Sequence, residues 1–253
     1  STKIGQGKDP DRYHMNILVT GGASGLGEAM TRKLASNTSN QVYFTYCKSK
    51  EKAILIEKEL RNARAVRCDF NHATELNELL QKMSEWDLQV VINNAMQGME
   101  QKHFHKIEPD FFLKSFQGNV LPVIQITQQA LSIFRKARYG KIITILSSYI
   151  VNTPPIGLSE YVANKAYLLS LHKSWAAENA SFNITSNCIS PSFMITPLTK
   201  DTDERVIEEM TGKHPLKKLL TVDEVSESVF YLTQCSQQIN GTNLVMNAAQ
   251  NVT

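Results

Sequence analysis

Long apolar runs, paired cysteines and an excess of charge of one sign are all missing from this sequence of 253 residues. The longest apolar runs, such as 142–146, fall far short of the roughly 18 residues that a membrane-spanning helix needs. The 27 lysines and arginines nearly balance the 24 aspartates and glutamates, which argues against a surface that binds nucleic-acid phosphates. Cys47, Cys68, Cys188 and Cys235 contain no C-x-x-C pair, so we expect reduced thiols rather than disulfides. The composition predicts a soluble, cytoplasmic, globular protein without a nucleic-acid or membrane partner.

Glycine is also scarce, with 12 residues in the chain, which is below the average of about 7%. Four of these glycines, Gly21, Gly22, Gly25 and Gly27, nevertheless fall in one short segment that directly follows an apolar run. A glycine-rich turn between a strand and a helix allows a ligand to approach the backbone closely, and the helix N-terminus can then bind the pyrophosphate of a dinucleotide. A packing turn without a ligand is the alternative interpretation.

Short apolar or β-branched segments alternate with longer segments of helical periodicity after Met15. Strands are predicted at 16–20, 41–47, 65–67, 89–93, 141–146, 184–189 and 243–246. Helices are predicted at 25–36, 49–62, 73–84, 109–138, 158–179 and 222–235. Because strands that are apolar throughout are covered on both faces, this alternation predicts an α/β fold with one doubly wound, seven-stranded parallel sheet.

The first fifteen residues differ from the rest in composition. Residues 1–15 are polar, charged and rich in turn formers, which is typical of a linker, and they begin without Met. We expect a linker-like tail, and possible fusion to another domain at the N-terminus; a processed or tag-derived tail is the alternative. Residues 16–253 are predicted to form a single domain.

Further candidate cofactor-binding residues follow the predicted strands. They are Gly21, Ser24, Gly25, Leu26 and Gly27 in the glycine turn, Asp69 and Phe70 after the third strand, Asn94 and Ala95 after the fourth, and Pro191, Met194 and Thr196 after the sixth. The motifs at these positions resemble those of the short, single-domain branch of the short-chain dehydrogenase/reductase family. The resemblance implies a Rossmann-type fold in which these residues bind a nicotinamide dinucleotide. It also implies that Asp69 lies against the adenine and that the segment 191–196 closes over the nicotinamide.

A second set of residues matches the catalytic residues of the same family. Tyr161 and Lys165 are four residues apart, so they share one helix face, and a charged lysine lowers the pKa of a neighbouring phenol toward the working range of a proton donor. The resemblance implies that Lys165 also binds the nicotinamide ribose and that Asn119 kinks its helix and holds a water that relays protons to Lys165. Ser147 and Ser148 are both candidates for polarising a carbonyl oxygen. The alignment of the preceding strand fits Ser147, whereas the spacing to Tyr161 narrowly favours Ser148.

The end of the second predicted strand bears on the choice of cofactor. Members of the family that use NAD carry an acidic residue there, but here Lys48 and Ser49 occur and no acid precedes Glu51. Because a cation and a hydroxyl can bind a 2′-phosphate, we expect NADP(H) rather than NAD(H). Ser24 stands where the family's other phosphate-binding position has Arg, and ordinary solvated charges are the alternative interpretation of the lysines.

Glycines of the family motifs are replaced at three places. Met96, Ser192 and the pair Ala248-Ala249 stand where the family has glycine. These replacements motivate one alternative function, a non-catalytic dinucleotide-binding sensor or scaffold module, although the catalytic set is intact.

The favoured function is an NADP(H)-dependent reductase in residues 16–253 that acts on a small-molecule carbonyl, with a 3-oxoacyl thioester as the expected substrate. The lysines within 213–218 and the linker-like N-terminus motivate a different substrate, a keto-sugar or polyol phosphate reduced by one domain of a longer fused chain. No metal is expected, because His103 and His105 have no cysteine or carboxylate cluster beside them.

The helical segments 109–138 and 158–179 carry more apolar residues than one sheet-facing stripe requires. The residues that suggest this excess are Phe111, Phe112, Phe116, Ile124, Leu131, Phe134, Tyr167, Leu168, Leu171 and Trp175. A helix with such an excess must bury it against another surface, which predicts a homodimer or homotetramer.

Overall fold

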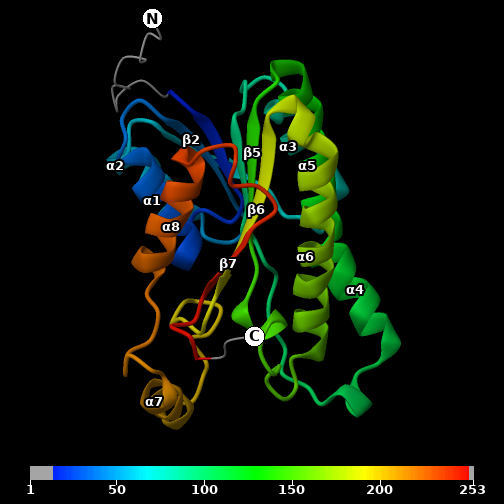
Figure 1. Ribbon diagram of the computed structural model, residues 1–253, viewed down its shortest axis with the longest axis vertical. Coiled ribbons are helices and arrows are strands. Elements are labelled where there is room, and N and C mark those ends of the chain that lie inside the picture. The colour runs from blue at the N-terminus through cyan, green and yellow to red at the C-terminus, as the bar shows by residue number, and fades with distance from the viewer. Residues whose placement is uncertain (1–13, 251–253) are drawn as a thin grey trace, which may run out of the picture.

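Seven parallel strands form one sheet in the computed structural model, which describes residues 14–250 (Figure 1). The strands are β1 (Asn16–Val19), β2 (Gln41–Tyr46), β3 (Ala63–Arg67), β4 (Val90–Asn93), β5 (Gly140–Ile145), β6 (Ile184–Pro191) and β7 (Asn243–Met246). Their order in the sheet is β3-β2-β1-β4-β5-β6-β7, so the chain first winds outward from β1 and then returns to place β4 on its other side. The predicted doubly wound fold is confirmed. In such sheets ligands bind at the carboxyl ends of the strands where the winding direction reverses.

Helices cover both faces of this sheet (Figure 1). One face carries α1 (Gly25–Ala35), α2 (Lys50–Glu59) and α8 (Val222–Gln234), and the other carries α3 (Ala73–Met83), α5 (Leu121–Ala137) and α6 (Ser159–Asn179). Each face has its own hydrophobic core, with Phe44 and Met30 at the centre of one and Phe134 and Leu79 at the centre of the other. Every residue of β4, β5 and β6 is buried, as expected for strands covered on both sides.

The helix predicted over 109–138 is interrupted near its middle. It divides into α4 (Pro109–Asn119) and α5, with Val120 between them at φ −110° and ψ −49°. Pro122 lies in the first turn of α5, and its ring nitrogen has no hydrogen to donate back into α4. The break places Asn119 at the end of a helix, where its side chain can bond to another segment.

One helix was not predicted. The helix α7 (Glu204–Lys213) follows the loop after β6 and has no buried residue. Its first turn is capped by Asp203, whose carboxylate accepts a hydrogen bond of 2.8 Å from the backbone N–H of Arg205, and Lys213 forms an ion pair with Glu209. Local interactions rather than burial therefore support α7.

Most of the predicted tail, residues 1–13, lies outside the described residues. Its last residue, Met15, is buried in the core, and its carbonyl oxygen accepts a hydrogen bond of 2.9 Å from the N–H of Gln41. The packed part of the chain therefore already includes Met15, which the sequence assigned to the tail. Within the described part of the chain, no helix has both the length and the apolar character that a membrane crossing requires.

Candidate active site

The turn between β1 and α1 leaves no room for a side chain at its glycine positions. Gly21 and Gly25 have φ values of +66° and +53°, a left-handed conformation that favours glycine. A Cβ atom on Gly27 would lie 1.9 Å from the carbonyl oxygen of Gly21. Thr45, near the end of β2, fixes the turn: its Oγ1 accepts a bond of 2.9 Å from the N–H of Gly21, and its carbonyl oxygen accepts one of 2.8 Å from the N–H of Gly22.

The same turn presents backbone donors at the start of α1. Ser24 is extended, and its carbonyl oxygen accepts a hydrogen bond of 3.2 Å from the N–H of Glu28. The N–H groups of Gly25, Leu26 and Gly27 therefore lie in the first helical turn, where they have no intrahelical acceptor. The side chain of Leu26 packs into the core. A glycine-rich turn whose backbone N–H groups lie at the positive end of a helix fits the pyrophosphate of a dinucleotide.

The segment after β4 lies directly against this turn. Thr20 joins them, because its Oγ1 accepts hydrogen bonds of 2.9 Å from the N–H of Asn94 and 3.0 Å from the N–H of Ala95. The side-chain amide of Asn94 donates back to the carbonyl oxygen of Thr20 at 2.9 Å. A Cβ atom on Gly21 would lie only 3.0 Å from the Cα atom of Ala95. The structure thus brings together three of the expected cofactor residues.

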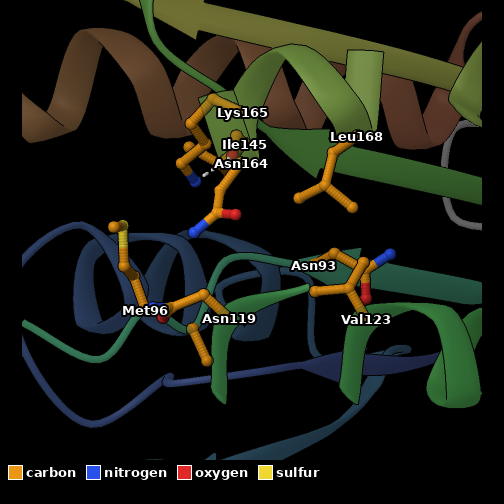
Figure 2. A pocket seen from close by; sticks show the side chains of 9 residues that line it. Asn93, Met96, Asn119, Val123, Ile145, Asn164, Lys165 and Leu168 are labelled. Atoms are coloured by element: carbon orange, nitrogen blue, oxygen red, sulfur yellow. Dashed lines mark hydrogen bonds between the residues drawn. The ribbon is translucent and has the colours of Figure 1, made fainter. Parts of the chain in front are cut away.

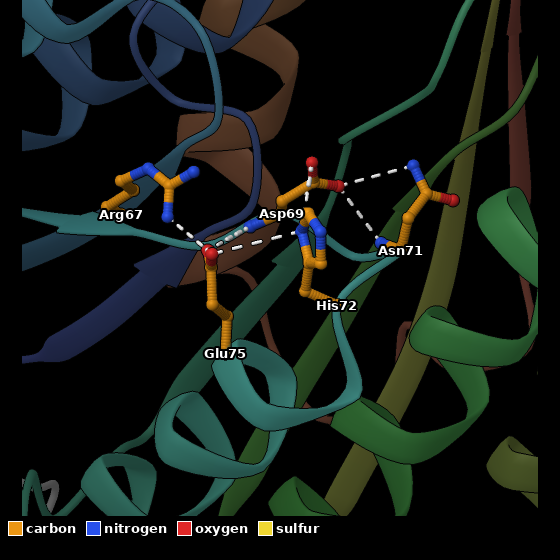
Figure 3. Close-up of polar contacts among 5 residues, drawn as sticks. All are labelled: Arg67, Asp69, Asn71, His72 and Glu75. Atoms are coloured by element: carbon orange, nitrogen blue, oxygen red, sulfur yellow. Dashed lines mark hydrogen bonds and ion pairs between the residues drawn. The ribbon is translucent and has the colours of Figure 1, made fainter.

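A polar cluster surrounds Asp69 after the end of β3 (Figure 3). Its Oδ1 accepts hydrogen bonds from the backbone N–H of Asn71 at 3.0 Å and from the side-chain amide of Asn71 at 3.2 Å, while His72 Nδ1 lies 3.3 Å from Oδ2. The backbone N–H of Asp69 donates to Glu75, which also pairs with Arg67. The bond from the Asn71 backbone lowers the pKa of Asp69. The carboxylate is therefore ionised at neutral pH and can accept a hydrogen bond from an exocyclic amine such as that of adenine.

The residues expected to select the cofactor lie beside this cluster. Lys48 is exposed directly after β2, and Ser49 is the N-cap residue of α2. The thiol of Cys47 hydrogen-bonds to the carboxylate of Asp69, and partial burial raises the pKa of this thiol. Phe70 packs against the hydrophobic core. The end of β2 and the end of β3 therefore form one polar edge with a lysine on it.

Tyr161 and Lys165 lie on α6 at the carboxyl end of β5, and each is only 8% exposed. Lys165 Nζ donates a hydrogen bond of 2.7 Å to the carbonyl oxygen of Ile145, the last residue of β5, and lies 5.9 Å from the centre of the Tyr161 ring. The hydroxyl of Ser147 hydrogen-bonds to Tyr161. The structure therefore brings the phenol, the lysine and one serine together.

The geometry favours Ser147 over Ser148, contrary to the choice that the spacing suggested. Ser147 faces Tyr161 and also accepts a hydrogen bond of 3.2 Å from the N–H of Tyr149. Ser148 begins a short 3-10 turn, Ser148–Ile150, and its side chain is buried. The spacing to Tyr161 includes loop residues, so it does not report which serine faces the helix in the folded chain.

Burial controls the ionisation of both catalytic candidates. It raises the pKa of Tyr161, against an opposing effect of the Ser147 hydrogen bond, and it lowers the pKa of Lys165 to about 8. The expected lowering of the phenol pKa by the lysine is therefore not what this structure shows, because desolvation disfavours the charged form of both groups. At neutral pH the phenol keeps its proton and can donate it, while the lysine remains largely charged.

A cavity of about 10 Å³ lies beside Lys165 (Figure 2). Its lining consists of Asn93, Ala95, Met96, Asn119, Val123, Ile145, Asn164, Lys165 and Leu168. Its volume is about what one water molecule needs, and amide and amine groups in its wall can bond to such a water. Asn119 is held by Gln97, whose backbone N–H donates to Asn119 Oδ1 at 2.7 Å. The break between α4 and α5 therefore lies at this cavity, and the relay water that the resemblance implies at Asn119 stays a prediction.

The segment after β6 lies over the glycine turn. A Cβ atom on Gly25 would approach the ring of Pro197 to 2.8 Å. Thr199 holds this segment in shape: its Oγ1 accepts a bond of 2.9 Å from the N–H of Thr196 and donates one of 2.7 Å to the carbonyl oxygen of Met194. This segment, which includes Met194 and Thr196, therefore lies near the turn, and its expected closure over the nicotinamide stays a prediction.

The residues that replace family glycines behave in two ways. Ser192, next to Pro191 at the end of β6, and Met96 both have ordinary negative φ values. Ala248 and Ala249 instead keep the left-handed conformation, with φ values of 51° and 58°. Such a conformation costs a residue with a Cβ atom about 1–2 kcal/mol.

The two histidines considered as metal ligands lie on an exposed segment, with ring centres 5.8 Å apart. Among residues 14–250, no group of three or more His, Cys, Asp or Glu side chains is placed to hold a metal ion.

Five polar residues around the site were not anticipated from the sequence as contributors: Thr45, Cys47, Ser115, Glu160 and Asn164. Thr45 and Cys47 lie at the carboxyl end of β2, a position that could have identified them. Glu160 and Asn164 are four residues apart beside the Tyr161–Lys165 pair, so helical periodicity could have linked them to it. No local signal identifies Ser115, whose contact with Glu160 joins positions 45 residues apart in the chain.

Comparisons with known proteins agree with this geometry. Residues 15–206 match the short chain dehydrogenase family. The 3-oxoacyl-[acyl-carrier-protein] reductase FabG of Staphylococcus aureus (strain Mu50 / ATCC 700699) is 28% identical over 240 residues, which cover 92% of this chain and 96% of the relative. FabG of Buchnera aphidicola subsp. Schizaphis graminum (strain Sg) is 29% identical over 252 residues, with coverage of 93% and 97%.

A solved structure shares the fold. A single-residue variant of the actinorhodin polyketide ketoreductase, crystallised with NADPH, superposes with a TM-score of 0.85 at 23% identity and covers 94% of this chain and 98% of its own. The family match extends over most of the chain and includes the glycine turn and the Tyr161–Lys165 pair. This chain is therefore an oxidoreductase that belongs to the short chain dehydrogenase family.

Proposed function

We propose that this protein reduces a small-molecule carbonyl with NADPH, or oxidises the corresponding secondary alcohol with NADP⁺. The observation that carries the proposal is the convergence of Tyr161, Lys165 and Ser147 beside the glycine turn at the carboxyl edge of the sheet. A proton donor, a cation and a hydroxyl placed together are the groups that reduction of a carbonyl requires from the protein.

Each group has a distinct role in the proposed reaction. The bound dinucleotide supplies or accepts the hydride. The hydroxyls of Ser147 and Tyr161 hydrogen-bond to the carbonyl oxygen of the substrate, and Tyr161 gives its proton to that oxygen as negative charge develops there. Lys165, while charged, stabilises the tyrosinate that remains. Asn119 and a water in the adjacent cavity then return a proton toward Lys165 and the phenol.

The preference for NADP(H) rests on the edge formed by β2 and β3. Lys48 is exposed there and Ser49 offers a hydroxyl, and no acid precedes Glu51 to repel a 2′-phosphate. A charge-assisted contact to a phosphate contributes about 1.5–3 kcal/mol. NADPH should therefore bind at least about tenfold more tightly than NADH, and Lys48→Asp should narrow or reverse this difference. Equal dissociation constants in the unmutated protein would rule out this preference.

The substrate class that we propose is a 3-oxoacyl thioester. It is supported by similarity to relatives whose names describe 3-oxoacyl-[acyl-carrier-protein] reductases and whose lengths this chain covers almost completely. A panel of 3-oxoacyl thioesters, simple ketones and keto-sugar phosphates, followed as NADPH oxidation at about 340 nm, tests it. Turnover of the thioesters is the expected result, and turnover of the sugar phosphates alone would contradict the substrate assignment.

The variant Tyr161→Phe distinguishes catalysis from cofactor binding alone. Loss of a positioned proton donor should lower the rate by about 10²–10⁴-fold, while NADPH affinity stays nearly unchanged because the ring still packs. If the variant kept more than about a tenth of the wild-type rate, Tyr161 would not be the acid. A wild-type protein that bound NADPH but turned over no carbonyl would favour a sensor or scaffold module instead.

We also propose a homo-oligomer that uses α4 and α6. Three of the residues that suggested an apolar excess are buried within the subunit: Phe134, Leu168 and Trp175. Leu113 on α4 and Tyr167 on α6 remain 62% and 45% exposed, and pairing with a second copy would cover them. Light scattering at micromolar concentration should give at least twice the 28.4 kDa of one chain, and a mass near 28.4 kDa would refute the proposal.

A further inference from the structure

A buried carboxylate lies beside the catalytic candidates but has no role in the reaction described above. Glu160 directly precedes Tyr161 on α6, and only 6% of it is exposed. Burial raises its pKa, with a further effect from Glu100. A carboxyl group is rarely buried unless hydrogen bonds satisfy it, so its contacts indicate what it does.

Two donors converge on one oxygen of this carboxylate. Ser115 on α4 donates its hydroxyl proton to Glu160 Oε1, and the side-chain amide of Asn164 donates to the same oxygen at 2.7 Å. The amide of Asn164 also lies 2.9 Å from Ser115 Oγ. Glu160 on α6 is therefore linked to α4 through Ser115, and Asn164 contacts both of these side chains.

Ser115 extends this network to the helix end that the reaction uses. Its Oγ accepts a hydrogen bond of 3.2 Å from the side-chain amide of Asn119, one turn further along α4. Asn119 and Asn164 both line the cavity beside Lys165 (Figure 2). The network therefore runs from Glu160, through Ser115 and Asn164, to two of the amides that form the cavity wall.

From this geometry we infer that Glu160 is a positioning residue for the reductase reaction, which fixes the amides of Asn119 and Asn164 around the Lys165 cavity. This inference rests on the proposed function, because the proposed reaction uses a water in that cavity.

The orientation of Ser115 follows from a count of donors and acceptors. A serine hydroxyl has one proton and two lone pairs, and the amides of Asn119 and Asn164 occupy the lone pairs. Its only proton must then point to Glu160, an acceptor. Without that acceptor, Ser115 can rotate and donate to a carbonyl of its own helix, as serine commonly does. Asn119 would then keep only its hydrogen bonds to the backbone of Gln97, and Asn164 would lose its contact with Ser115.

The test compares Glu160→Ala with Glu160→Gln. Alanine removes the acceptor, whereas glutamine keeps a carbonyl oxygen that can accept the same two hydrogen bonds. For Glu160→Ala we expect kcat to fall by about tenfold or more, because misplaced groups near the chemistry are costly, with the dissociation constant of NADPH within about twofold of wild type. For Glu160→Gln we expect at least half of the wild-type kcat. Glu178→Ala, which changes an exposed glutamate on the same helix, is the matched control.

Three results would overturn the inference. One is a Glu160→Ala variant that keeps more than half of the wild-type kcat, and another is a Glu160→Gln variant that loses as much as the alanine variant. The third is a loss that affects NADPH binding as strongly as kcat. If Glu160→Ala does not fold, Ser115→Ala removes the central hydroxyl with a smaller change, and its kcat should fall at unchanged NADPH affinity; an unchanged kcat would equally overturn the inference.

Crystal structures separate this inference from the proposed function. If the wild-type protein reduced no carbonyl, the proposed function would fail, but the positioning role could still be read from the coordinates. In Glu160→Ala, we expect Ser115 Oγ to move out of hydrogen-bond distance of the Asn119 amide, whereas in Glu160→Gln it should stay. Unchanged positions of Ser115 and Asn119 in the alanine variant would refute the positioning role.

Discussion

Replacing Lys165 by methionine should stabilise the protein while it abolishes activity. Methionine is similar in length and apolar, so it can occupy the same buried space, but it cannot carry the charge that the proposed reaction uses. Burial lowers the pKa of Lys165 from 10.5 to about 8, which means that the folded protein resists protonation of this group. Removal of the group removes that cost.

The size of the effect follows from the two pKa values. At about 1.4 kcal/mol for each pKa unit, the difference between 10.5 and about 8 corresponds to about 3 kcal/mol at neutral pH. The pKa is lower in the folded state, so between these two values the unfolded chain binds more protons, and the stability of the wild type rises with pH. The cost is therefore fully present below about pH 8 and disappears as the pH approaches 10.5.

Urea unfolding of the wild type and Lys165→Met at pH 7 and pH 10 measures this effect. The variant should be more stable by about 3 kcal/mol at pH 7 and by less than about 1 kcal/mol at pH 10, because other groups titrate equally in both proteins. Lys173→Met, at an exposed position on the same helix, is the control and should change stability little at either pH. Equal stability of wild type and variant at pH 7, or a difference that persisted to pH 10, would refute the reasoning.

Three further predictions concern other parts of the structure. Ser147→Ala should lower kcat by at least about tenfold and Ser148→Ala by less, because the hydroxyl of Ser147 hydrogen-bonds to Tyr161; steady-state kinetics that gave the reverse order would reassign the serine. Ala248→Gly and Ala249→Gly should each raise the free energy of unfolding, measured in urea, by about 0.5–1 kcal/mol, because relief of the left-handed backbone strain exceeds the entropic cost of glycine. A loss of stability in either variant would contradict the positive φ values. Burial lowers the pKa of His172, so wild-type stability should fall as the pH drops below about 6.5, and thermal unfolding should show a smaller fall for His172→Leu.

The sheet could be predicted because its signal is local. Buried parallel strands are apolar throughout, and glycine follows the first of them, so seven strands and the first turn were placed nearly correctly. The helix α7 was missed; none of its residues is buried, and local capping and an ion pair stabilise it. Periodicity alone predicted one continuous helix over 109–138, because it does not report the missing N–H of Pro122 or the bond of Asn119 to a backbone group 22 residues away; only the family resemblance implied a kink there.

The catalytic pair could also be predicted, whereas the residues that hold it could not. Tyr161 and Lys165 are one helical turn apart, so their proximity follows from helix geometry alone. The choice between Ser147 and Ser148 depends on where a strand ends and how a loop returns, which residue spacing does not determine. Likewise, Glu160 acquires its contact with Ser115 only when α4 packs against α6.

A perturbed pKa does not by itself mark the active site of this protein. Lys141 and Lys165 are both buried, burial lowers the pKa of both, and both donate a hydrogen bond of 2.7 Å to a carbonyl oxygen. Lys141 lies near the amino end of β5, however, and its acceptor is Cys235 after α8, whereas Lys165 bonds to Ile145 at the carboxyl end of the same strand. In a doubly wound sheet, only the carboxyl ends meet the glycine turn. The end of β5 at which each lysine lies, rather than its burial, therefore explains why Lys165 is assigned to the reaction and Lys141 to the structure.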